Sequence, residues 1–281
     1  ITTPYDLAAN RLEHAKNQSI NTVGVGFGTT IERNEKYVSL YYKDLLFPNV
    51  LNQKIKMIHH YYMVHHEMVV KDNVKEKDIK EFKDACSYMV NHSKIETYFK
   101  LTNYKHVVFE GAQGLMLDQD IGYFPFVTRS NTGLYGLFKN PDILKLFEKV
   151  DTIPEVYYVT RSYQTRHGNG PINPPLSKTV FEDKFLENET NNTNVYQGSF
   201  RYGKLDVNLI YYAISSDIIH TLRLTNFEHK SNLVITCMDQ YSVKEAINYD
   251  KLLKLPVDNF IYVNSREWDM ESIVEEGKLP F

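Results

Sequence analysis

The sequence predicts an α/β protein built on a mostly parallel β-sheet that is flanked by helices. Four short apolar runs, at residues 106–109, 156–159, 233–236 and 260–263, are each followed by polar turns, as buried strands are. Helical stretches separate these runs, and strands that are joined through helices pair in parallel. Because ligands of such sheets bind beyond the carboxyl ends of the strands, the residues after each run are the first candidates for a site.

Three segments carry apolar residues at the spacing of an amphipathic helix, at about residues 50–70, 76–92 and 205–224. Residues 171–198 are different, because proline, asparagine, threonine and charged residues dominate there and no apolar period survives. This composition is typical of a long surface excursion. We expect a single domain over residues 1–281 that carries this excursion.

Composition argues against several classes of protein. The net charge of −3 supplies no basic face, so nucleic acid is not an expected partner. No long apolar stretch of about 18 residues is present, so we expect a cytoplasmic protein without a membrane partner. The 2 cysteines are too few for a disulfide scaffold or a cysteine-based zinc site. Histidine pairs on the first helix lie outside the three- or four-residue spacing that metal ligands favour, so no metal site is assigned.

The polar turn after the first apolar run has the residue types of a nucleotide site. Gly111 and Gly114 let the backbone approach a ligand closely, and the amide of Gln113 can both donate to and accept from a purine edge. Further along the chain, Thr128 supplies a neutral donor suited to a phosphate or a hydroxyl group. On these residues alone, a nucleotide site and an ordinary polar loop are equally good interpretations.

A second glycine-containing loop occupies residues 22–28. Its alternating glycines expose successive backbone N–H groups that can surround an anion. Neither a dinucleotide-binding fingerprint nor a Walker loop has this spacing. Taken alone, the loop favours a structural glycine turn over a phosphate site.

Three ordered segments resemble the adenylosuccinate synthetase family. Residues 109–132 are similar to its signature, in which a Phe-Glu-Gly-Ala-Gln-Gly run precedes an aspartate-rich turn and a Pro-aromatic-Val-Thr segment. Residues 163–171 resemble the family's purine loop, and residues 196–206 resemble its aspartate loop, which ends in Gly-x-Leu-Asp. The resemblance implies a fold related to the P-loop NTPases but lacking its amino-terminal portion, and a ligase of purine biosynthesis that joins aspartate to a purine nucleotide.

The resemblance also implies roles for individual residues. The amide of Gln113 stabilises the activated 6-oxygen of the purine, which makes it the expected catalytic residue, and His167 is a wall of the site and not an acid. The purine nucleotide is expected at Thr22, Gly24, Gln113, Gly114, Thr128, His167 and Gly168. Aspartate is expected at Gln197, Gly198 and Arg201, the base of the triphosphate at Asp239 and Ser265, and a phosphate contact across a subunit interface at Arg33 or Lys36.

Departures from the family pattern leave the substrates open. Where the family has several arginines in the aspartate loop, this chain has Arg201 alone, a form similar to the shorter archaeal and phage members. Cys237 stands where the family has a lysine close to Asp239, so the triphosphate is GTP or ATP. The purine monophosphate is IMP or dGMP.

In the family, the catalytic base, a phosphate loop and the catalytic acid come before the segment that this chain begins to match at about residue 5. No counterpart is found in these 281 residues. The chain is therefore expected to be a fragment of a longer synthetase, half of a split enzyme whose amino-terminal part is a separate polypeptide, or a noncatalytic nucleotide sensor derived from the family. The resemblance further implies Mg²⁺, with ligands outside this chain, and a homodimer.

Overall fold

The structure is a computed structural model that describes most of the chain. It describes residues 1–16, 22–66, 73–150, 153–172, 175–177, 189, 191, 193, 195–240, 249–263 and 273–276. The chain divides into two compact units: unit 1 is Ile1–Lys100 with Val195–Gln197, and unit 2 is Leu101–Asn194 with Gly198–Phe281. Whether both units form the single domain expected over residues 1–281 stays a prediction.

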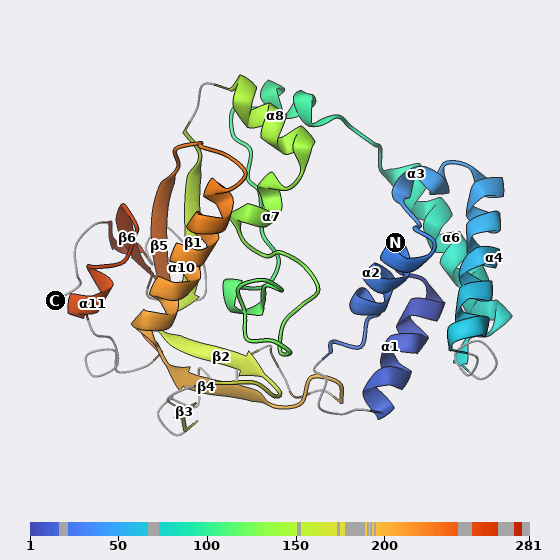
Figure 1. Ribbon diagram of the computed structural model, residues 1–281, viewed down its shortest axis with the longest axis horizontal. Helices are drawn as coiled ribbons and strands as arrows, with labels where there is room; N and C mark the ends of the chain where they lie inside the picture. The colour runs from blue at the N-terminus through green and yellow to red at the C-terminus, as the bar shows by residue number, and fades with distance from the viewer. Residues whose placement is uncertain are drawn as a thin grey trace. The chain divides into compact units, whose positions relative to one another are not determined.

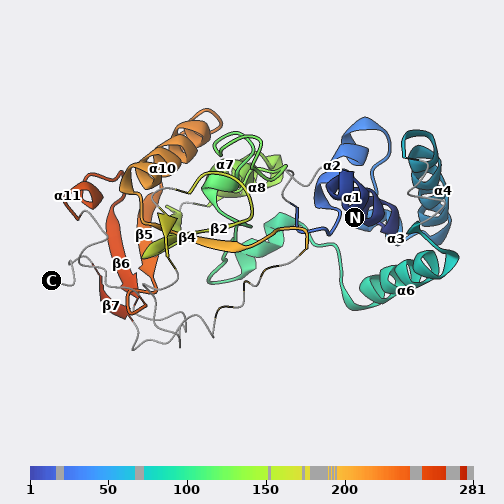
Figure 2. The same cartoon turned by 90° about the horizontal axis from the view of Figure 1, so that it is seen from below.

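Unit 1 is made of helices that pack around α1 (Figures 1 and 2). Its elements are α1 (Pro4–Lys16), α2 (Phe27–Lys36), α3 (Tyr42–Leu45), α4 (Pro48–His65) and α6 (Glu76–His92), and the 3₁₀ helix η1 (Tyr98–Asn103) continues into unit 2. α4 begins with Pro48, whose fixed φ and missing N–H suit a first turn. The core of the unit contains Leu40, Ile58 and Tyr62, all nearly inaccessible to solvent.

Unit 2 contains a four-stranded sheet with the order β1-β5-β6-β7. Its strands are β1 (Glu155–Arg161), β5 (Lys230–Thr236), β6 (Asn259–Val263) and β7 (Ile273–Glu276). β1, β5 and β6 are parallel, and β7 is antiparallel to β6. The helix α10 (Val207–Leu222) packs on this sheet through a core that joins Ile214 to Leu233 and Ile235.

A second sheet of unit 2 is antiparallel, with the order β2-β4-β3. Its strands are β2 (Tyr163–His167), β3 (Pro175–Leu176) and β4 (Phe200–Lys204). One face carries the aromatic side chains of Tyr163, Phe200 and Tyr202, which form a small core with Cys237. Since side chains alternate along a strand, the side chains of the intervening residues of β2 and β4 lie on the opposite face of the sheet.

Short helices complete unit 2: the 3₁₀ helix η2 (Leu115–Leu117), α7 (Leu134–Phe138), α8 (Pro141–Lys149) and α11 (Tyr249–Leu252). Asp217, which is fully buried, joins α10 to α7 and to β1. Its carboxylate accepts hydrogen bonds from the backbone N–H groups of Leu134 and Tyr135 and from the hydroxyl of Tyr158. Burial raises the pKa of Asp217, although the three hydrogen bonds act in the opposite direction.

The predicted α/β fold with a parallel sheet flanked by helices is confirmed. The apolar runs at 156–159, 233–236 and 260–263 lie within β1, β5 and β6. The predicted helices correspond to α4, α6 and α10. The predicted excursion at 171–198 falls largely on residues that the structure does not describe, and β3 lies within it.

The strand predicted at 106–109 is wrong. These residues have no regular secondary structure and belong to no ladder of the described sheets. Val108 is 88% exposed, whereas a buried strand would cover it. An apolar run becomes a strand only when another strand pairs with it, and the described residues bring none beside this run.

No helix in the described part of the chain is both long and apolar enough to cross a membrane.

Candidate functional site

The polar loop after residue 109 brings two of the predicted nucleotide residues together. The amide nitrogen of Gln113 donates to Oγ1 of Thr128 over 3.2 Å. Gln113 has a φ of 64°, in the left-handed region that side chains other than glycine rarely occupy. Gly114, the next residue, is exposed. The loop therefore presents an amide and a hydroxyl side by side, at a backbone position of unusual conformation, as functional sites often do.

A buried carboxylate shapes this loop from inside. Asp118, which is 1% exposed, accepts hydrogen bonds from the backbone N–H groups of Asp120 and Thr132 and from the side-chain amide of Asn131. The backbone N–H of Thr128 also donates a hydrogen bond to the carbonyl of Leu117, which closes the same loop. Asp118 is thus a structural acceptor that fixes residues on both sides of the turn.

The antiparallel ribbon of β2 and β4 carries the predicted residues His167, Gly168 and Arg201. His167 lies opposite Phe200, whose ring centroid is 4.7 Å away. The N–H of Gly168 donates to the carbonyl of Ser199, and a Cβ built on Gly198 would lie 3.4 Å from Cα of Gly168. The two predicted glycines therefore lie in close contact at one end of the ribbon.

Arg166 connects the ribbon to the segment of the Gln113 loop, and Arg201 lies opposite it in the ladder. Nη2 of Arg201 donates to the carbonyl of Gly170 over 2.7 Å, and Nη2 of Arg166 donates to the carbonyl of Phe126 over 2.8 Å. Phe126 precedes Thr128 by two residues, so the bond from Arg166 joins the ribbon to the segment that carries Thr128.

The residues that follow β5 form a tight turn at its carboxyl end. Cys237 is buried with a φ of 60°, and its carbonyl accepts a hydrogen bond from the hydroxyl of Ser162. Asp239 follows in the turn and is exposed. Ser265, the other residue predicted to contact the triphosphate base, lies outside the described residues.

Other predicted residues belong to unit 1. The hydroxyl of Thr22 donates to the side-chain oxygen of Asn10 and accepts from the N–H of Gly24. Gly24 has a φ of +75°, and a Cβ at this position would lie 2.5 Å from the ring of Tyr196. Gln197, predicted to contact aspartate, follows Tyr196 and is also part of unit 1. The glycine at 24 is therefore required by both its conformation and a close aromatic contact.

Arg33 is one of the two residues predicted to make a phosphate contact across a subunit interface. Its side chain is completely buried in unit 1, and five hydrogen bonds use the five N–H donors of the guanidinium. Two of these bonds go to Asp6, and the others go to Asn34, Val38 and the carbonyl of Ile1. Lys36, the other candidate, is exposed and forms an ion pair with Glu32, and the contact predicted for Arg33 or Lys36 stays a prediction.

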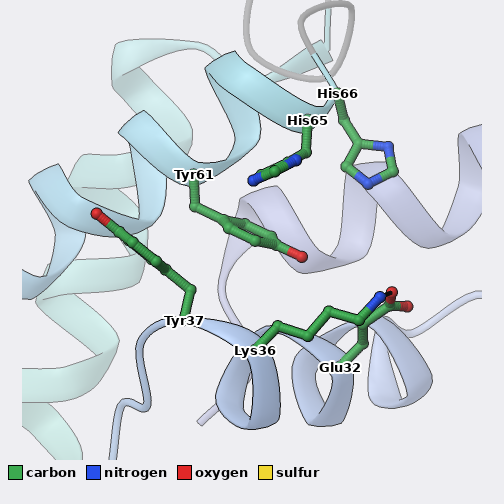
Figure 3. A pocket seen from close by; sticks show the side chains of 6 residues that line it. All are labelled: Glu32, Lys36, Tyr37, Tyr61, His65 and His66. Atoms are coloured by element: carbon green, nitrogen blue, oxygen red, sulfur yellow. Dashed lines mark hydrogen bonds and ion pairs between the residues drawn. The ribbon is translucent and has the colours of Figure 1, made fainter.

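Lys36 lines a pocket of unit 1 of about 370 Å³ (Figure 3). The lining residues are Glu32, Lys36, Tyr37, Tyr61, His65 and His66. The rings of Tyr37 and Tyr61 stack with centroids 5.6 Å apart, and the Tyr61 hydroxyl points toward the space between His66 and the Lys36–Glu32 pair. Burial lowers the pKa of His66, the carboxylate of Glu32 opposes this effect, and neighbouring cations add to it. Sequence reasoning did not find this pocket.

The described residues contain no cluster of three or more histidine, cysteine, aspartate or glutamate side chains that could hold a metal ion. Mg²⁺ in nucleotide sites is commonly held by one or two carboxylates together with phosphate oxygens. Such a site needs no cluster of three side chains, and the Mg²⁺ implied by the resemblance, with ligands outside this chain, stays a prediction.

The parallel sheet, with polar loops beyond the carboxyl ends of β1 and β5, defines an α/β protein whose ligands are expected at that edge. The family model described as Adenylosuccinate synthetase matches residues 1–274. The chain therefore belongs to the adenylosuccinate synthetase family.

Curated relatives that carry this name agree with the assignment. An adenylosuccinate synthetase of Francisella philomiragia is 26% identical over 309 aligned residues, which cover 100% of this chain and 66% of the relative. One of Buchnera aphidicola is 28% identical over 80% of this chain and 53% of the relative. One of Francisella tularensis subsp. novicida is 26% identical over 89% of this chain and 57% of the relative. The chain thus spans about half to two thirds of the length of these relatives.

Sequence reasoning missed two polar residues of β2, Gln164 and Arg166. Both lie in the 163–171 segment, but neither was assigned a role. The signal that identifies them is the register between β2 and β4, which places Arg166 opposite Arg201. That register pairs residues about 35 positions apart in the chain and is not visible in local patterns.

Proposed function

We propose that this chain is part of a purine nucleotide–aspartate ligase of the adenylosuccinate synthetase type. The observation that carries the proposal is the hydrogen bond between Gln113 and Thr128, within the segment that resembles the family signature. Membership of the family supports the same class of reaction. The substrates are IMP or dGMP, L-aspartate, and GTP or ATP.

The proposed reaction has two steps. The γ-phosphoryl group of the triphosphate is transferred to the purine 6-oxygen, which releases the diphosphate. The amino nitrogen of aspartate then forms a bond to C6, the C6–O bond breaks, and inorganic phosphate leaves as the nitrogen loses a proton. Mg²⁺, when bound with the triphosphate, spreads the charge of the transferred phosphoryl group.

Each predicted residue has a task in this scheme. The amide of Gln113 donates to the 6-oxygen as negative charge develops on it, a form of stabilisation that depends on donors fixed in advance. Thr128 and Thr22 hold the phosphate of the monophosphate, and Arg201 holds a carboxylate of aspartate. Asp239 accepts N–H groups from the base of the triphosphate. The base and the acid of the reaction are expected on a segment outside residues 1–281, in the same polypeptide or a separate one, and the active form is expected to be a homodimer.

The test is to mix the chain with an amino-terminal segment of a relative, IMP or dGMP, aspartate, Mg²⁺, and GTP or ATP, and to measure succinyl-purine by mass spectrometry. Gln113→Ala is expected to lower kcat about 10²–10³-fold, the usual loss when one donor to a developing oxyanion is removed. Gln119→Ala is a matched control, because Gln119 is an exposed amide of the same loop. Absence of product with every combination of substrates would contradict the proposal.

Calorimetry separates the ligase from a noncatalytic sensor. Nucleotide binding followed by phosphate release supports the ligase. Binding of the same nucleotides without phosphate release, when the amino-terminal segment is present, identifies a sensor.

A further inference from the structure

Two arginines lie directly opposite each other on the antiparallel strands β2 and β4. Arg166 and Arg201 are partners in the ladder, so both side chains leave the same face of the sheet. Like charges in this arrangement destabilise a sheet. Burial, and then the charge of Arg201, lower the pKa of Arg166. Such a pair needs a balancing negative charge.

The described neighbours of the two guanidinium groups supply carbonyl oxygens only. Arg166 donates from Nε to the carbonyl of Asn169 over 3.0 Å and from Nη2 to that of Phe126, and Arg201 donates from Nη2 to that of Gly170. The ion pairs of the described residues include neither arginine. Two positive charges are therefore held together among neutral acceptors.

Two buried donors on this face have no acceptor among the described residues: Nε of Arg201 and Nε2 of Gln164. Gln164 precedes Arg166 by two positions on β2, so its side chain lies on the same face, diagonal to Arg201. A buried donor without a partner destabilises the folded state. One anionic ligand with several oxygens would satisfy both donors and neutralise the paired arginines.

We propose that Gln164, Arg166 and Arg201 form the binding site of a dicarboxylate, with Arg166 as the second guanidinium. The inference rests on the proposed function, because it assigns residues to the aspartate of that reaction. Guanidinium groups match carboxylates with two parallel hydrogen bonds. A four-carbon dicarboxylic amino acid has one carboxylate for each arginine. The segment 196–206 has a single arginine, and β2 supplies the other one across the ladder.

Gly170 holds the space between the two arginines open. Its carbonyl accepts from Arg201, and a Cβ built on it would lie 2.5 Å from Nε and Nη2 of Arg166. Its φ of +104° also favours glycine over any other residue. A side chain at this position would displace the guanidinium of Arg166 while leaving both arginines in the sequence.

The test measures binding of succinate, L-aspartate and inorganic phosphate to the full chain by isothermal titration calorimetry, alone and with the amino-terminal segment of a relative. We expect Arg166→Gln and Arg201→Gln each to weaken succinate binding at least about tenfold, since each removes a charge-assisted pair of hydrogen bonds. Arg166→Lys is expected to restore only part of the affinity, because an ammonium group lacks the planar fork. Arg223→Gln is the matched control, since Arg223 is the exposed C-cap residue that follows α10.

Thermal unfolding separates a binding role from a structural one. Without ligand, Arg166→Gln is expected to melt at or above the temperature of the unmodified chain, because the like-charge contact is removed. Succinate is expected to raise the melting temperature of the unmodified chain but not that of the variant. A variant that melts lower, yet binds succinate with unchanged affinity, would show that Arg166 is structural and overturn the inference.

Three other outcomes also overturn it: succinate binding that is unchanged in Arg166→Gln, phosphate binding as tight as succinate binding, or no succinate binding in either form of the chain. The proposed function fails separately. Succinate binding through both arginines without succinyl-purine formation would refute the ligase function, and the dicarboxylate site would stand. Product formation by Arg166→Gln with an unchanged KM for aspartate would refute the dicarboxylate site, and the proposed ligase function would stand.

Discussion

Arg33 and Asp6 form an ion pair with two hydrogen bonds that is completely shielded from solvent in unit 1. Nε of Arg33 lies 2.7 Å from Oδ1 of Asp6, and Nη2 lies 3.0 Å from Oδ2. The hydroxyl of Tyr62 also donates to this carboxylate. The pair joins α1 to α2, and Tyr62 adds α4 to the same contact. The side chain of Arg33 therefore connects helices within the core of unit 1.

Removing either partner of this pair is expected to destabilise the protein strongly. Arg33→Met or Asp6→Asn should each lower the free energy of unfolding by about 3–5 kcal/mol, because the remaining charge is buried without compensation. Lys36→Met is the control: the Lys36–Glu32 pair is largely exposed, and such pairs contribute at most about 1 kcal/mol. Urea unfolding followed by circular dichroism measures the free energy of unfolding of each of the three variants. Equal, small losses in all three variants would contradict the structural role of Arg33.

Asp118→Ala is expected to destabilise the Gln113 loop. The substitution leaves the partly buried N–H groups of Asp120 and Thr132 without their acceptor, and each costs less than the about 1–3 kcal/mol of a fully buried donor. Asp120→Ala removes an exposed carboxylate of the same turn and should have a smaller effect. Hydrogen exchange of the amides from 115 to 132 measures the local effect. Unchanged protection in Asp118→Ala would show that the turn forms without this carboxylate.

Asp206→Ala tests why the segment 196–206 ends in aspartate. Asp206 is the N-cap of α10, and its carboxylate accepts from the N–H groups of Asn208 and Leu209. Loss of this cap is expected to lower the free energy of unfolding by about 1 kcal/mol, whereas Asp206→Asn should be nearly neutral because asparagine caps equally well. Chemical denaturation of the three proteins gives the comparison. A similar loss in both variants would indicate that the charge acts elsewhere.

Glu189 is expected to make stability depend on pH in the acid range. Burial raises the pKa of its carboxyl, but the hydrogen bonds from Arg161 and Asn191 outweigh burial and hold the pKa at about 2, below its ordinary value of 4.5. The folded state therefore favours the ionised form. This contribution is complete above pH 4.5 and is lost as the pH falls toward 2. Glu189→Gln should flatten the fall in melting temperature over this range, and Glu148→Gln, at an exposed position of α8, should not.

Local patterns in the sequence predicted the parts of the fold that depend on local periodicity. The short apolar runs before polar turns located β1, β5 and β6, and the three- and four-residue spacing located α6 at its observed bounds. The run at 106–109 failed because a strand also needs a partner, and partners are set by contacts distant in the chain. The α/β class needed only the order of the elements.

The same distinction between local and distant contacts applies to the candidate site. Gln113 and Thr128 lie in one continuous segment, and their contact follows from it. The ion pair of Arg33 was not foreseen, because its partner, Asp6, lies 27 residues earlier and the burial of both was not visible in the sequence. Arg166 was missed for the same reason, since only the strand register brings it opposite Arg201.

At residue 113, the backbone conformation that favours glycine conflicts with the proposed need for a side-chain amide. A glycine there would adopt the φ of 64° without the penalty of about 1–2 kcal/mol that a side chain incurs. A search for more heat-resistant variants would therefore select Gln113→Gly among its first gains, and would discard the amide on which the proposed reaction depends. Screens for thermal resistance of this chain consequently need an activity measurement beside them.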